Sequence, residues 1–249
     1  MTPSRIAWIR IFTVALLWAA WEAVSVSGWV FKGVVPSSFD VLRSVGRHLG
    51  EAAFYAHLWR TFYEVAAGFA IGGLAGLALG VVMGLSRFLG RMLDPYINVL
   101  APTPKIVFLP VLMILFGVDV GSKVAMGAIS AFFPVVMTTY AGMHLVSPVL
   151  VQVAKGFQAT RWQLVAKVYL PSMAEPVITG MRLGLGVAII GTLLAEIKLS
   201  NKGLGYLAIQ YYNAFHIADM YAILLITFAL AVAANALIGR TSLHFKPRR

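Results

Sequence analysis

Long apolar stretches separated by polar, proline-containing or glycine-containing connections dominate the hydropathy pattern of this chain. A helix that crosses the hydrocarbon layer of a membrane needs about 20 mostly apolar residues, because each residue rises about 1.5 Å and the layer is about 30 Å thick. Six stretches meet this requirement, at residues 6–31, 61–85, 97–117, 122–145, 175–197 and 217–239. The pattern predicts an all-α integral membrane protein with six transmembrane helices in a single domain, residues 1–249.

Two connections carry helical patterns of their own. Between the first two spans, residues 36–57 place Phe39, Val41, Leu42, Val45 and Leu49 among charged residues at helical spacing, which predicts a short amphipathic helix on the outer surface. Residues 146–173, between the fourth and fifth spans, form the longest connection on the inner side and are predicted to contain short amphipathic helices.

Composition and charge support a membrane location. Hydrophobic residues make up 60% of the 249 residues and charged residues 12%. In a soluble domain roughly half of the residues are hydrophobic and about a quarter are charged. The formal charge of +11 indicates the excess of Lys and Arg found in cytoplasmic loops rather than a nucleic acid partner. With both termini in the cytoplasm, 13 of the 20 Lys and Arg residues, Lys105 among them, lie on the inner side.

Small residues recur at every fourth position of the second span. This glycine stripe consists of Gly68, Gly72, Gly76, Gly80 and Gly84. Because lipid gives helices no hydrophobic reason to associate, small residues that allow close backbone approach mark packing faces. We expect the stripe to pack helices within one subunit, and a subunit interface is the alternative.

Three ionisable residues within or near the spans are candidates for a solute pathway or gate: Glu64, Arg182 and Glu196. A charge inside the membrane is costly unless it has a partner or reaches water, so such residues are often functional. The alternatives are side chains that extend to the interface and, for Glu196, a structural role in fixing the loop that follows it.

Enzyme motifs are missing from the sequence. There is no His-Glu-x-x-His metal pair, no Gly-x-Ser-x-Gly nucleophile elbow and no Gly-x-x-x-x-Gly-Lys-[Ser/Thr] phosphate loop, and the chain has no cysteine. We therefore expect no catalytic residue, no metal site and no cofactor, and if ATP drives this protein another chain binds it.

The inner connection 146–173, here called the coupling loop, mixes apolar residues such as Phe157 and Trp162 with basic and amide residues. A loop this apolar is expected to dock against a partner, and lying flat on the membrane is the alternative. It resembles the cytoplasmic loop of the membrane subunits of bacterial ABC importers, which has the pattern Glu-Ala-Ala, three residues, Gly, nine residues, Ile-x-Leu-Pro.

The spacing of that motif fits without a gap. Ala154, Leu170 and Pro171 match it, while Gln152 replaces the glutamate and Gln158 replaces the glycine. In the family the glycine allows a sharp turn between two short helices, so Gln158 must adopt that turn at some cost or shape it differently. By this resemblance, these five positions couple the chain to an ATPase.

Further segments extend the resemblance over nearly the whole chain, to the branch that imports nitrate, sulfonates, taurine and similar compounds: 35–38, 58–61, 94–95, 110–117, 132–134 and 203–205. The resemblance implies a type I importer permease in the bacterial inner membrane that pairs with itself. It also implies two cytoplasmic ATPase subunits and a periplasmic or lipid-anchored substrate-binding protein. An ion-coupled secondary transporter using Glu64 or Glu196 is the main alternative, and an intramembrane enzyme is a second.

Overall fold

Helices make up every regular element in the computed structural model, which describes residues 3–29 and 34–244. Within these residues, five helices are long and apolar enough to cross a membrane: α1 (Pro3–Ser27), α3 (Ala52–Leu85), α6 (Val120–His144), α10 (Ala174–Leu199) and α12 (Ile217–His244). The all-α membrane fold predicted from the sequence is confirmed.

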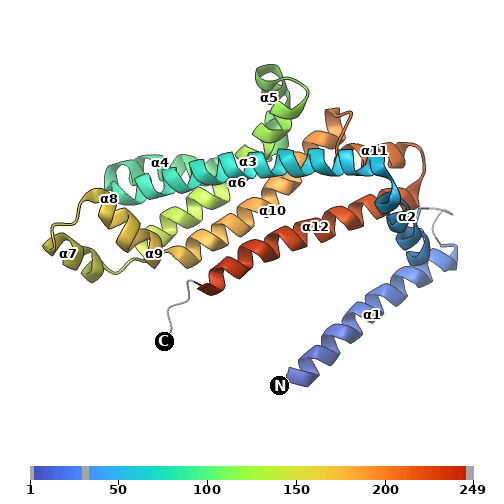
Figure 1. Ribbon diagram of the computed structural model, residues 1–249, viewed down its shortest axis with the longest axis horizontal. Coiled ribbons are helices and arrows are strands. Elements are labelled where there is room, and N and C mark those ends of the chain that lie inside the picture. Colours follow the sequence, from blue (N-terminus) through green and yellow to red (C-terminus); the bar gives the residue numbers. More distant parts are fainter. Residues whose placement is uncertain (1–2, 30–33, 245–249) are drawn as a thin grey trace.

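The core of the bundle is α6, which packs between α3 and α10 (Figure 1). Its buried side chains are small or β-branched for the most part, and Ala131, Val135 and Val136 are completely buried. Such residues let the neighbouring backbones approach closely, as interfaces between membrane helices require. α12 lies alongside α10 and completes the bundle.

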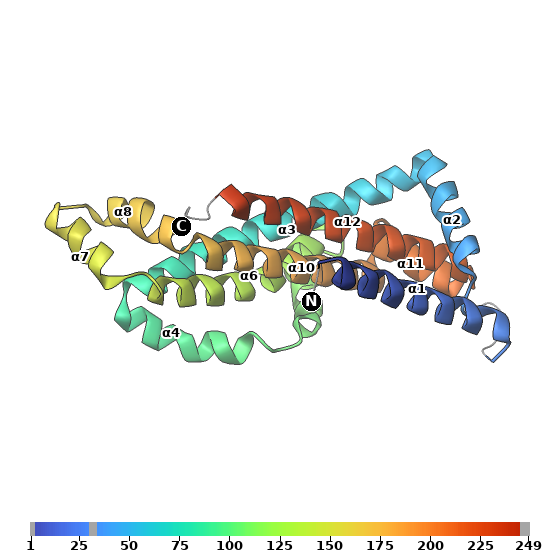
Figure 2. The same ribbon diagram turned by 90° about the horizontal axis from the view of Figure 1, so that it is seen from below.

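The third predicted span, residues 97–117, is wrong as a single straight helix. The structure has α4 (Arg87–Leu100), a 3₁₀ turn η1 (Lys105–Phe108) and α5 (Leu109–Phe116), with a bend of 95° at the break. Pro102 and Pro104 favour the break, since neither has an N–H to continue the helical hydrogen bonds and Pro104 disfavours helical backbone at Thr103. α4 runs beside α6, and α5 projects from the bundle (Figures 1 and 2).

Shorter helices occupy both ends of the bundle. At one end, called the α2 end, lie α2 (Ser38–Gly50) and α11 (Leu204–Asn213). At the other, the loop end, the coupling loop folds into α7 (Pro148–Gly156), α8 (Arg161–Leu164), a π-helical turn η2 (Val165–Tyr169) and α9 (Leu170–Ser172). α3 begins nine residues earlier than the predicted second span, because no helix breaker stands between Ala52 and that point.

α1 stands apart from the bundle for most of its length (Figures 1 and 2). Its contacts lie near its C-terminal end, where Trp21 Nε1 donates to the Pro36 carbonyl at 3.0 Å and Glu22 accepts hydrogen bonds from the backbone and hydroxyl of Ser38. Its large apolar side chains from Trp8 to Trp18 are exposed in the single chain, so lipid or another protein chain must cover them.

Some sequence expectations concern residues outside the described part of the chain. They are the end of the predicted first span at Phe31 and four members of the basic-residue count, Lys32, Lys246, Arg248 and Arg249.

Candidate functional site

The turn of the coupling loop is built around Gln158. α7 ends at Gly156, and the N–H groups of Gln158 and Ala159 then donate to the carbonyls of Lys155 and Ala154 at 2.9 and 3.0 Å. This pair of bonds is a Schellman motif, in which the residue at the position of Gln158 adopts left-handed backbone and is usually glycine. Gln158 has a φ of +56°, so it adopts the turn that the family's glycine would favour.

A second local signal starts α8. The Thr160 hydroxyl accepts from the Gln163 N–H at 3.2 Å, and the Gln163 side chain accepts from the Thr160 N–H at 2.8 Å. This capping box directs the chain back toward the bundle immediately after the turn. The Thr-x-x-Gln pattern of residues 160–163 is the sequence signal for this helix start.

Apolar side chains project from this loop into the surroundings. Phe157 is 84% exposed and Trp162 is 77% exposed, with Val149, Leu150 and Val153 half or more exposed nearby. Burying two aromatic side chains of this size is worth several kcal/mol, and exposed aromatic patches of this kind mark interaction surfaces. The loop end of the bundle therefore carries an apolar surface without a partner in the single chain.

The motif positions divide between this surface and the bundle. Leu170 packs, partly buried, against a cluster that contains Met143 and Met173 at the loop end of the bundle. Gln152 and Pro171 are exposed, and Ala154 on α7 is half-buried. Leu170 thus anchors the loop to the bundle. Gln152, Ala154 and Gln158 instead lie on the α7 part of the loop, away from that anchor.

A buried polar cluster joins three helices near the α2 end. Glu196 on α10 is fully buried, and its carboxylate accepts from the Thr61 hydroxyl at 2.7 Å and from the Gly205 N–H at 2.7 Å. Thr61 on α3 in turn accepts from the Leu204 N–H at 2.7 Å. Glu196 therefore holds the first turn of α11 against α3, and sequence reasoning missed Thr61 as its partner.

Glu64 lies one turn along α3 from Thr61 and is also fully buried. Its Oε1 accepts from Arg60 Nε at 2.8 Å, and Arg60 also pairs with Asp119 before α6. The buried Lys123 on α6 donates to the Val118 carbonyl. We call Thr61, Glu64, Lys123 and Glu196 the buried polar cluster; each of its charged side chains makes at least one hydrogen bond, and the second carboxylate oxygen of Glu64, Oε2, is buried without one.

Arg182 does not belong to this cluster. It lies on the opposite half of α10, where its Nε donates to Asn235 Oδ1 of α12 at 3.1 Å and its side chain stays exposed. The structure thus brings Glu64 and Glu196 together and places Arg182 elsewhere. Within the described residues, no group of three His, Cys, Asp or Glu side chains is arranged to hold a metal ion.

The glycine stripe faces α6 along its whole length. A Cβ atom at Gly68 would lie 2.7 Å from the Val124 carbonyl oxygen, and one at Gly76 would lie 2.7 Å from that of Phe132. At Gly84 the nearest atoms belong to Met143. The stripe therefore packs two helices of one chain, and the alternative of a subunit interface does not describe this face.

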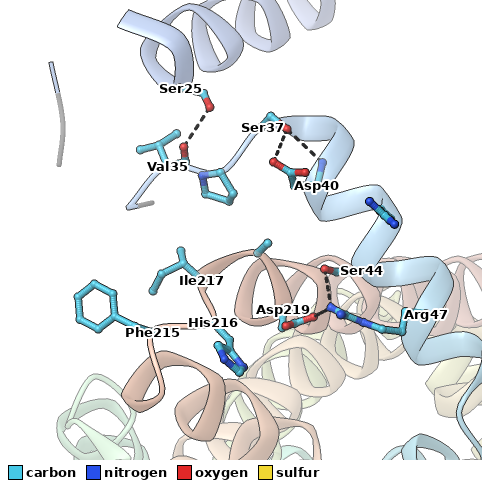
Figure 3. A pocket seen from close by; sticks show the side chains of 13 residues that line it. Ser25, Val35, Ser37, Asp40, Ser44, Arg47, Phe215, His216, Ile217 and Asp219 are labelled. Carbon is cyan, nitrogen blue, oxygen red and sulfur yellow. Dashed lines mark hydrogen bonds and ion pairs between the residues drawn. The ribbon is translucent and has the colours of Figure 1, made fainter. Parts of the chain in front are cut away.

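A cavity of about 940 Å³ opens at the α2 end between α1, α2 and the start of α12. Figure 3 shows Arg47 pointing to Asp219, to which it is ion-paired, and donating to the Ser44 hydroxyl at 3.1 Å. On the α1 side the Ser25 hydroxyl donates to the Val35 carbonyl at 3.0 Å. The Arg47–Asp219 pair joins α2 to α12 and the Ser25 bond joins α1 to the segment before α2, so these polar groups have partners within the chain.

Comparison with known proteins agrees with this geometry. Residues 72–249 match the family described as the binding-protein-dependent transport system inner membrane component. The chain is 30% identical over 205 residues to the protein named as an aliphatic sulfonates transport permease, SsuC of Bacillus subtilis, covering 82% of this chain and 74% of that one. It is 29% identical over 247 residues to the taurine transport system permease protein TauC of Escherichia coli, covering 95% and 90%.

The fold is also that of a solved transporter chain. A chain of the MetNI methionine ABC transporter, in an inward-facing conformation, superposes with a TM-score of 0.65 at 18% identity and covers 84% of this chain and 98% of its own length. The chain therefore belongs to the family of binding-protein-dependent transport system inner membrane components, and it is a multi-pass permease subunit of an ABC importer.

Proposed function

We propose that this permease forms the translocation path for a small anion or organic solute of the nitrate, sulfonate or taurine type and works as a homodimer with both termini in the cytoplasm. The support for the substrate class is the pair of relatives named for aliphatic sulfonates and taurine, at 30% and 29% identity. The exposed apolar face of α1 supports a second copy, because a partner subunit offers side chains to cover it.

The coupling loop is the contact with the ATPase in this proposal. The observation that carries it is the exposed aromatic pair, Phe157 and Trp162, on either side of a tightly fixed turn at the loop end. A rigid turn presents these side chains at little entropic cost, as a docking surface requires. Closure of two ATPase subunits moves the loop, and Leu170 passes the movement to the bundle.

Glu64 and Glu196 act as structural ties in this mechanism and do not contact the solute. Both are fully buried and bonded within the chain, so a solute has no access to them in this conformation. Glu196 binds the first turn of α11, and Thr61 of α3 binds the same turn, so α11 stays packed against α3 at the α2 end of the bundle. Arg182, exposed beside Asn235, is available to a neighbouring chain.

Reconstitution tests the proposal. The chain is co-purified with its ATPase subunit, placed in liposomes with the substrate-binding protein of the same transporter, and supplied with MgATP and radiolabelled taurine, ethanesulfonate or nitrate; methionine, which has neither a sulfonate nor a nitrate group, is the control. We expect ATP-dependent uptake of at least one of these three solutes and none of methionine. A chain that binds no ATPase, or a complex that takes up methionine in place of these solutes, contradicts the proposal.

Two further measurements test the homodimer and the orientation. Multi-angle light scattering in detergent is expected to give twice the mass of one chain. Because the native chain has no cysteine, single cysteines placed at Leu145 and at Leu49 report the side of the membrane without background. A membrane-impermeant thiol reagent applied to intact spheroplasts should label position 49 and spare position 145, and the reverse result overturns the orientation.

A further inference from the structure

One charged side chain lies at the break of the third span. The sequence count places Lys105 on the inner side, but its ammonium sits over the ring of Phe133, 4.7 Å from the centroid. Phe133 is 13 residues from the start of α6 and 11 from its end, so it lies about 20 Å from one end of that span and about 16 Å from the other. The ammonium therefore lies beside the middle of α6, a helix long and apolar enough to cross a membrane.

A charge at this depth requires partners, and Lys105 has a full set. Its Nζ donates to the carbonyls of Leu100, Ala101 and Thr103 at 3.0, 2.7 and 2.6 Å. An ammonium has three N–H donors, so all three are used. The face of an aromatic ring adds an attraction that grows when water is excluded.

The carbonyls that Lys105 binds lie at the C-terminal end of α4 and in the break that follows it. A helix leaves its last carbonyls without helical donors, and Pro104 has no N–H to serve the Leu100 carbonyl, which accepts from the Thr103 N–H at 3.2 Å as well as from the ammonium. The ammonium adds donors at this helix end and at the same time contacts α6 through Phe133. One side chain thus caps α4 and ties the bend to the core helix.

From this geometry we infer that Lys105 is a positioning residue for transport, which fixes the break between α4 and α5 against α6 through the Leu100, Ala101 and Thr103 carbonyls and the Phe133 ring. The inference rests on the proposed function, because it assigns the fixed bend a part in the ATP-driven cycle. Lys105 does not offer an N–H to the solute, since its donors are occupied.

Four variants separate the contribution of the capping hydrogen bonds from that of the Phe133 ring. Lys105→Met removes the charge and the donors at similar length, and Lys105→Arg keeps both. Phe133→Leu removes the ring beneath the ammonium, and Phe132→Leu is its matched control, since Phe132 contacts Phe133 edge-on and does not lie beneath the ammonium. The Phe133→Leu variant leaves the capping hydrogen bonds in place, so it decides the question if Lys105→Met does not insert into the membrane.

The first readout is the position of α5. Spin labels on cysteines introduced at Ile114 of α5 and Leu145 at the loop end of α6 give one distance within the chain, measured in nanodiscs with an excess of unlabelled chain. Both side chains are highly exposed, so labels there disturb little packing. We expect a narrow distance distribution for the parent, a broad one for Lys105→Met, and recovery in Lys105→Arg.

The second readout is MgATP hydrolysis by the complex with its ATPase. We expect Lys105→Met to lower kcat by about tenfold with KM for MgATP unchanged within about twofold, because the nucleotide site lies in another subunit, and Lys105→Arg to restore at least about half of kcat. The kcat of Phe133→Leu should lie between those of Lys105→Met and Lys105→Arg, and the kcat of Phe132→Leu should equal that of the parent.

An unchanged distance distribution in Lys105→Met, or a kcat within about twofold of the parent, overturns the assignment. Failure of the proposed function is seen separately, because the unsubstituted chain would then bind no ATPase, while the distance measurement does not depend on that partner.

Discussion

Gly76 gives the sharpest test of how this bundle is packed. A Cβ atom there would lie 2.7 Å from the Phe132 carbonyl oxygen, 3.0 Å from Val135 Cβ and 3.1 Å from the Val136 N. Ordinary contacts of a Cβ atom are 3.4–4 Å, and two of these three atoms are backbone. Even alanine therefore forces α3 and α6 apart by several tenths of an ångström.

The magnitude follows from two opposing effects. Overpacking a well-packed interface costs about 1–3 kcal/mol, and a gap of about 0.5–1 Å elsewhere along the seam loses a quarter to a half of the local dispersion energy. Replacing a helical glycine by alanine returns up to about 1 kcal/mol through helix propensity. We expect Gly76→Ala to lower the free energy of unfolding by about 1–2 kcal/mol and Gly76→Leu to prevent assembly.

Gly186 provides the matched control. It lies within α10, and no heavy atom lies within 4 Å of its Cβ position, so alanine there gains propensity without a clash. Unfolding of the purified chain by sodium dodecyl sulfate in mixed micelles, followed by circular dichroism, measures both variants. If Gly76→Ala were as stable as Gly186→Ala, the close contact between α3 and α6 would not limit stability and the packing argument would fail.

Three further outcomes are expected. Ala154→Asp should reduce co-purification of the ATPase by about tenfold or more, because an unpaired charge in a docking surface costs several kcal/mol, while the exposed Lys167→Glu should have a smaller effect; equal binding by both would reject the docking surface. Gln158→Gly should raise the free energy of local opening of the loop by up to about 1 kcal/mol, because glycine takes the φ of +56° without strain. Limited proteolysis should then cleave the loop more slowly, and faster cleavage would refute the strained turn. Glu196→Ala should destabilise the chain by about 2 kcal/mol or more, because it leaves the buried Thr61 and Gly205 donors unpaired. Replacing the exposed Glu175 of the same helix by alanine should change the thermal unfolding little. Equal melting temperatures of the two variants would contradict the structural role of the Glu196 hydrogen bonds.

Much of the architecture was predictable because a membrane imposes strong rules. A span must be apolar over a fixed length, and small residues at regular spacing mark packing faces, so the spans around α3, α6, α10 and α12 and the all-α class follow from composition and spacing alone. The loop motif, with Ala154, Leu170 and Pro171 at the right spacing, indicates the importer family from the sequence alone.

Hydropathy could not locate the break in the third span. The residues on both sides of the prolines are apolar, so an apolar window does not distinguish a straight helix from two helices at 95°. Nor does it give depth, which is why Lys105 was counted with the inner basic residues although its ammonium lies beside Phe133.

Partnership between distant residues was decided by tertiary structure alone. Thr61 and Glu196 are 135 positions apart, and no spacing rule links residues on different helices. The same holds for the face of the glycine stripe, because helical periodicity shows that Gly68 and Gly84 share a side but not which helix they meet. Local sequence sets which segments form helices and which face is small, whereas the pairing of buried polar groups depends on how the helices assemble.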